Sequence, residues 1–96
     1  MRRNGLTGVQ IHIPPFLLSY TENLTQDYVS GNTIMECLML LVERFPQLKS
    51  RLFDTKDKLR RDLKIYLNKS HVHPREFSRP VKNGDELYIV GVIVGG

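Results

Sequence analysis

A chain of 96 residues with 41% hydrophobic content has the size of one domain, and its single core leaves no room for a separate substrate domain. The net charge of +4 is small for nucleic-acid binding, and acidic residues interrupt the basic run from Lys56 to Lys64, which weakens a phosphate footprint. We therefore read that run as a solvated loop rather than a docking patch for an acidic partner, and we expect no nucleic-acid partner.

Cysteine content and the amino end bear on the compartment. Cys37 is the only cysteine, so no disulfide can form within the chain, which indicates a reducing compartment. The opening Met1-Arg2-Arg3-Asn4-Gly5 is followed by no apolar run of signal length, and no stretch approaches a membrane span. We predict a cytoplasmic protein with no membrane partner that is a monomer when free.

Two strands are predicted before the first helix. Val9, Ile11 and Ile13 alternate with polar residues, which is the period of a half-buried strand. Pro14-Pro15 ends this strand because proline cannot donate to a ladder. After an apolar-rich connection, Thr25 to Val29 forms a weaker strand pattern that is closed by a Ser-Gly pair.

From Thr33 the hydrophobic period becomes helical. The positions with the spacing of one buried helix face are Ile34, Cys37, Leu38, Leu41, Val42 and Phe45. Thr33 and Glu36 fit a capping box, in which each side chain accepts a backbone N–H at the helix start, and Pro46 marks the stop. We predict one main helix from Thr33 to Phe45, with Cys37 in the core rather than acting as a reactive thiol.

The second half of the chain is predicted to hold a connector and further strands. Gln47 to Asp62 is charged and shows little period, whereas Leu63 to Leu67 alternates as a strand. Any strand after the turn at 68–70 must be brief, because that segment is polar and contains prolines. Asn83-Gly84-Asp85 signals a turn, since glycine takes the positive φ that such turns need, and Glu86 to Val90 is the last strand.

This order of elements predicts an α+β domain. One helix on one face of a mixed sheet of four or five strands buries a single core, and the ββαββ order is that of the β-grasp, ubiquitin-like fold. The last strand should lie centrally, beside the first, because right-handed parallel connections leave few alternatives. We predict one domain over residues 1–96, with a flexible amino end at 1–7 and a flexible carboxyl tail at 91–96.

The carboxyl end, Val92-Ile93-Val94-Gly95-Gly96, says most about function. Ordering glycine costs more backbone entropy than ordering any other residue, so two terminal glycines are costly to hold in place. Their advantage is thinness: without Cβ atoms, Gly95 and Gly96 can pass through a narrow channel in a partner enzyme. Taken alone, a Gly-Gly ending is also compatible with a frayed terminus of no function.

Further motifs place this ending in context. Together with Lys64-Ile65-Tyr66-Leu67-Asn68 and the run from Asn83 to Val90, it resembles the ThiS, MoaD and ubiquitin-related sulfur carrier family. In that family a strand ending in asparagine precedes a Gly-Asp turn, a last strand and the diglycine. The predicted helix and its proline stop are also similar. The resemblance runs from about Val9 to Gly96. One departure is Gly91, where many members have proline, and it predicts a more flexible tail at that point.

The resemblance implies a carrier function. An E1-like partner would adenylate the carboxylate of Gly96 with ATP, and sulfur from a donor would replace AMP to leave a thiocarboxylate that a biosynthetic enzyme accepts. The chain would then be no enzyme, with no catalytic residue and no bound cofactor, since ATP is used by the activating enzyme. The segments Ile13 to Leu17 and Leu59 to Leu63 look most like carriers for cysteine or homocysteine synthesis. Molybdopterin synthesis, thiazole synthesis and tRNA thiolation stay open.

Two other classes of function stay open as well. One is a ubiquitin-like modifier that is joined through Gly96 to lysines of other proteins. The other is a β-grasp interaction module with no part in catalysis. The tail separates these classes, because sulfur on Gly96 marks a carrier and branched Gly-Gly peptides mark a modifier.

A surface for partner docking is predicted beside the tail. If Leu87 and Ile89 face the helix, the outward residues form an apolar patch: Tyr66, Tyr88, Val90 and Val92, here called the docking surface. Aromatic groups suit such a surface because they bury a large area at low entropy cost. The alternative is that these are ordinary exposed residues.

Metal chemistry is not predicted. His71 and His73 are two residues apart and would share a strand face, but no carboxylate or thiol lies at ligand spacing. Two solvated histidines are the simpler interpretation. No phosphate-binding loop, dinucleotide fingerprint or nucleophile elbow occurs in the sequence.

Overall fold

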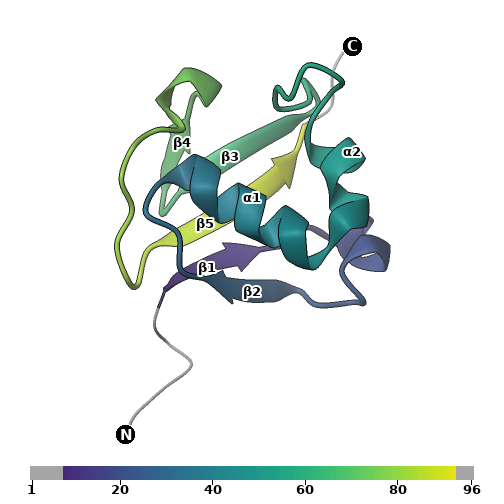
Figure 1. Ribbon diagram of the computed structural model, residues 1–96, viewed down its shortest axis with the longest axis horizontal. Helices are drawn as coiled ribbons and strands as arrows, with labels where there is room; N and C mark the ends of the chain where they lie inside the picture. Colours follow the sequence, from purple (N-terminus) through teal and green to yellow (C-terminus); the bar gives the residue numbers. More distant parts are fainter. Residues whose placement is uncertain (1–7, 93–96) are drawn as a thin grey trace, which may run out of the picture.

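The computed structural model describes residues 8–92. In chain order these hold β1 (Val9–His12), β2 (Gln26–Val29), α1 (Ile34–Arg44), α2 (Lys49–Leu52), β3 (Leu63–Leu67), β4 (Ser70–Val72) and β5 (Glu86–Gly91). Three short 3-10 helices join them: η1 (Pro15–Tyr20), η2 (Pro46–Leu48) and η3 (Pro74–Glu76). The strands form one sheet in the order β2-β1-β5-β3-β4, and α1 lies across one face of it (Figure 1). The predicted β-grasp fold is confirmed.

The last strand lies at the centre of the sheet, as predicted. β5 pairs in parallel with β1, where Ile11 is opposite Leu87, and antiparallel with β3, where Ile65 is opposite Ile89. These four side chains are almost completely buried. The last strand, drawn in yellow in Figure 1, is therefore paired on both sides and packed on the core.

Local signals at the start of α1 agree with the sequence, with one change. The backbone N–H of Glu36 donates to Thr33 Oγ1 at 3.1 Å, which is the predicted cap. The Glu36 carboxylate accepts the N–H of Asn32 at 2.9 Å instead of that of Thr33. The helix ends at Arg44, one residue before the predicted end, and Phe45 is its C-cap.

The core lies between α1 and the sheet. All six residues of the predicted helix face are buried in it: Ile34, Cys37, Leu38, Leu41, Val42 and Phe45. Burial raises the pKa of the Cys37 thiol, so this side chain stays neutral and acts as a small core residue, as predicted. The inward residues of β1, β3 and β5 complete the core from the sheet side.

The connector from Gln47 to Asp62 is more ordered than its sequence predicts. It contains η2 and the single helical turn α2, which bury Leu48 and Leu52 completely and leave Phe53 only 4% exposed. A helix of four residues spans about one turn, so it is too short to produce a visible 3.6-residue period. Three core residues therefore lie in a segment whose sequence predicts only a charged connector.

The ends of the domain need one correction. The predicted tail begins at residue 91, but Gly91 belongs to β5 and pairs with Leu63, and the N–H of Val92 donates to the carbonyl of Asp62 at 2.9 Å. The sheet thus extends past the predicted boundary. The rest of the predicted tail and the predicted amino end at 1–7 lie outside the described residues. Between residues 8 and 92, no helix is both long and apolar enough to cross a membrane.

Candidate functional site

β5 presents different residues on its two faces. Leu87 and Ile89 point into the core and are 0% and 3% exposed, whereas Tyr88 and Val90 are half-buried on the opposite face. Tyr66 of β3, also half-buried, pairs directly with Tyr88. Because side chains alternate across a sheet, these three residues share the face that α1 does not cover. The structure therefore brings together most of the predicted docking surface, whose docking role stays a prediction.

Val92 completes the docking surface at the end of β5. It is half-buried and, with Val90, lines a shallow hollow of about 560 Å³. The hollow also takes in Pro14, Pro15 and Phe16 from the segment after β1. Phe16 is 56% exposed, and its ring lies against Gly91, where an added Cβ would be 2.7 Å from Phe16 Cε1. Glycine at this position thus leaves room for an exposed aromatic ring beside the end of the strand.

Two histidines extend the outward face and were not predicted as part of it. The strand registers place four rings in one row across the sheet: His12, Tyr88, Tyr66 and His71. The ring centroids of Tyr66 and His71 are 5.5 Å apart at an interplanar angle of 51°. The sequence held a signal for His12, because it alternates with Ile11 and Ile13 and so had to face outward beside the predicted last strand.

His12, Glu86 and Tyr88 form a closed network on this face. The imidazole stacks on the Tyr88 ring with centroids 4.2 Å apart and an interplanar angle of 4°. Glu86 Oε1 accepts from His12 Nε2 at 2.7 Å and from the Tyr88 hydroxyl at 3.1 Å. The hydrogen bonds from His12 and then Tyr88 lower the pKa of Glu86, and burial followed by the carboxylate bond raises the pKa of Tyr88. At neutral pH the carboxylate is ionised and the phenol is neutral.

The turn before β5 is held by a buried carboxylate. Asp85 is 7% exposed and accepts from the N–H of Lys82 at 3.0 Å and from Asn68 Nδ2 at 3.3 Å. Burial acts to raise the pKa of Asp85, but these hydrogen bonds and the Lys82 ammonium outweigh it and lower that pKa. Gly84 has φ of +94°, as the predicted turn requires. Asn68, which directly follows β3, thus helps to set where β5 begins.

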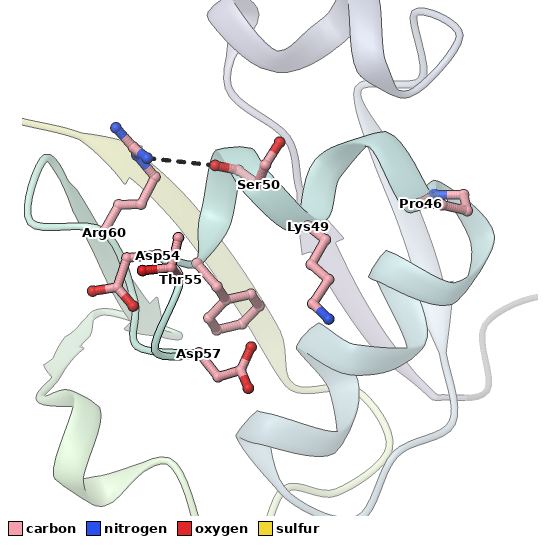
Figure 2. Close-up of a pocket in the computed structure, with 8 residues that line it drawn as sticks. Pro46, Lys49, Ser50, Asp54, Thr55, Asp57 and Arg60 are labelled. Atoms are coloured by element: carbon pink, nitrogen blue, oxygen red, sulfur yellow. Dashed lines mark hydrogen bonds between the residues drawn. The ribbon is translucent and has the colours of Figure 1, made fainter.

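A second hollow lies elsewhere on the described surface. It measures about 590 Å³ and is formed by η2, α2 and the segment 53–60, and no docking-surface residue lines it (Figure 2). One of its carboxylates serves the local backbone, since Asp54 Oδ1 accepts the N–H groups of Lys56 and Lys58 at 2.8 and 3.0 Å. Arg60 Nη1 donates to the carbonyl oxygen of Ser50 at 3.5 Å at the edge of the hollow, as Figure 2 shows. The hollow therefore lies between turns that these hydrogen bonds hold in place.

The other candidate residues are not gathered into a site. Within residues 8–92 no group of three or more potential ligands could hold a metal ion. His73 instead caps η3, with its Nδ1 accepting the N–H of Arg75 at 3.4 Å. Gly95 and Gly96, the predicted sites of adenylation and sulfur attachment, lie outside the described residues.

Comparison with solved structures gives close matches to the whole fold. A chain of the BexX/CysO complex from Amycolatopsis orientalis is 29% identical, with 93% of this chain and 100% of that chain covered and a TM-score of 0.79. CysO from Mycobacterium tuberculosis is 25% identical, with 90% and 100% covered and a TM-score of 0.80. The modifier SAMP1 from Methanosarcina acetivorans is 21% identical, with 94% and 98% covered and a TM-score of 0.78, and shares the fold.

Sequence comparison adds the family. Comparison with curated proteins found no match. The family model described as the ThiS family matches residues 19–96, which is most of the chain and includes Asn68, the turn at 83–85 and the terminal diglycine. Fold, turn and ending therefore agree, and the chain belongs to the ThiS family of ubiquitin-like sulfur carriers.

Proposed function

We propose that this protein carries sulfur as a thiocarboxylate on Gly96, after an E1-like enzyme has adenylated the terminal carboxylate. The observation that carries the proposal is the extent of the family match, which runs to residue 96 and so includes both terminal glycines. The likeness to CysO at 29% and 25% identity supports it. In this proposal the chain is a protein co-substrate and not an enzyme.

The chemistry explains why activation is needed. A carboxylate is a poor electrophile, because neither of its oxygens is a good leaving group. Its oxygen attacks the α-phosphorus of ATP, pyrophosphate leaves, and an acyl adenylate forms. A sulfur nucleophile then adds to the acyl carbon, and AMP departs with the electron pair of the C–O bond. The resulting thiocarboxylate is an anionic sulfur nucleophile that can be delivered to one acceptor.

The described residues support delivery by position. Val90 and Val92 are both half-buried and lie at the end of the central strand. β1 and β3 hold that strand on its two sides. A partner that binds Tyr66 and Tyr88 therefore meets the departing chain at a defined point. Holding a reactive end near its acceptor replaces a bimolecular encounter by an effectively unimolecular step.

For the sulfur acceptor we propose an enzyme of cysteine or homocysteine synthesis, in the cytoplasm. The likeness to two CysO chains favours this over molybdopterin or thiazole synthesis. One of those chains was solved in a complex with BexX, so a protein of this kind can be held by a larger assembly. Deletion of the gene should then make growth depend on added cysteine or methionine, whereas a requirement for thiazole or molybdopterin would reassign the acceptor.

Intact-mass spectrometry tests the carrier function. The protein is incubated with the adenylating enzyme of its own host, ATP and sodium sulfide, and the expected product has one oxygen replaced by sulfur. The variant lacking Gly96 should remain unmodified while its Tm stays unchanged. A wild-type protein that stays unmodified overturns the proposal. Branched Gly-Gly peptides on host lysines, without thiocarboxylate, would establish the modifier class instead.

A further inference from the structure

Tyr88 is held more completely than its neighbour on the docking surface. Its ring lies flat on His12, and its hydroxyl donates to Glu86 Oε1 at 3.1 Å. Tyr66, directly opposite, lies against the tilted ring of His71, and among residues 8–92 its hydroxyl has no hydrogen-bond partner. Two tyrosines on one face thus differ in how far their orientation is determined.

We propose that His12 and Glu86 are positioning residues that hold Tyr88 in one orientation before the activating enzyme docks. The inference rests on the proposed function, because it concerns the surface that this enzyme contacts. His12 acts on the ring and Glu86 on the hydroxyl, so neither rotation about the two side-chain torsions is free. Glu86 also bonds His12 itself at 2.7 Å, and the three contacts therefore support one another.

Preorganisation has a measurable consequence for binding. An aromatic side chain that is free to rotate loses that freedom when a partner orders it, and the loss weakens association. A side chain that is already fixed avoids the loss. The carboxylate stays ionised across the physiological range, because its hydrogen bonds lower the pKa of Glu86, so the acceptor for both bonds persists there. Tyr88 is thereby presented in the same orientation whenever the partner arrives.

A purely structural role fits this network poorly. The His12 and Glu86 side chains are 29% and 41% exposed, and exposed polar pairs of this kind contribute little to folding stability. The strands beneath them are held by the buried residues of the core and by the backbone ladder. Loss of either side chain should therefore leave the fold intact and change the surface.

The test measures binding and orientation separately. ATP–pyrophosphate exchange by the host adenylating enzyme gives KM for the carrier and kcat, and NMR couplings of Tyr88 report whether its side chain occupies one rotamer. His12→Ala and Glu86→Ala should raise KM about three- to tenfold with kcat within about twofold of wild type. Glu86→Gln keeps an acceptor oxygen and should stay within about twofold of the wild-type KM. Gln10→Ala, on the same outward face of β1, is the matched control.

The outcomes separate this inference from the proposed function. A raised KM together with averaged Tyr88 couplings in His12→Ala supports the inference. It is overturned if His12→Ala and Glu86→Ala leave KM unchanged, or raise it while Tyr88 keeps one rotamer. If Tyr88→Ala raises KM but His12→Ala and Glu86→Ala do not, the docking role of Tyr88 is supported and the positioning role of His12 and Glu86 is overturned. If wild-type protein supports no exchange at all, the proposed function fails and this inference fails with it.

Discussion

Replacing Asp85 by alanine should destabilise the fold by removing the acceptor on which the last turn depends. Two donors lose their partner: the Lys82 N–H at 3.0 Å and the Asn68 amide at 3.3 Å. At about 1 kcal/mol for each hydrogen bond, the free energy of unfolding should fall by about 2 kcal/mol. The ion pair with the Lys82 ammonium, 3.6 Å away on a side chain that is 84% exposed, adds little to this.

Urea and thermal unfolding measure this loss directly. For a domain of this size the expected fall in Tm is about 10 °C, at roughly 4–8 °C for each kcal/mol. Asp85→Asn is the matched control: it retains one acceptor oxygen and should lose about half as much stability. If the free energy of unfolding of Asp85→Ala lies within about 0.5 kcal/mol of the wild-type value, water replaces the carboxylate at this turn.

The same residue predicts a pH dependence whose sign follows from its environment. The pKa of Asp85 is lowered in the folded protein, because its hydrogen bonds outweigh the effect of burial. Its contribution to stability is therefore fully present above the unfolded pKa of about 3.9 and is lost as pH falls through the lower folded pKa. The stability difference between wild type and Asp85→Asn should shrink below about pH 4, and a difference that is constant from neutral to acidic pH would refute this reasoning.

Four further substitutions test the packing of the domain. Leu38→Ala, at a position 0% exposed, should cost about 2–5 kcal/mol in urea unfolding, whereas Met39→Ala, 42% exposed beside it, should cost less than about 1 kcal/mol. Gly31→Ala should destabilise by about 1–3 kcal/mol, because its Cβ would meet the backbone nitrogen of Cys37 at 2.8 Å. Gly91→Ala should cost less than about 1 kcal/mol despite a similar clash, because the exposed Phe16 ring can rotate away, and ring NMR shifts of Phe16 should report that rotation. Equal losses for the two glycine variants would contradict this distinction.

Local patterns were sufficient where an element was long enough to repeat them. The buried face of α1 spans 11 residues and so shows its period clearly, and Thr33 marks its start. The single turn of α2 is too short to show a period, so the sequence did not predict that its Leu52 is buried. The predicted tail begins one residue inside β5. Gly91 belongs to the strand because it pairs with Leu63 at the start of β3, and the identity of residue 91 does not report that pairing.

The docking surface, too, was only partly predictable from the sequence. Alternation in the last strand, the Asn-Gly-Asp turn and the terminal diglycine are local patterns of neighbouring residues. They predicted that Tyr88 and Val90 face outward and indicated the resemblance to sulfur carriers. The contact of His12 with Glu86 joins residues 74 positions apart. No local pattern reports such a contact, because it depends on the register in which β1 lies beside β5, and that register is set by packing of the whole core. The folded sheet therefore decides which outward residues become neighbours.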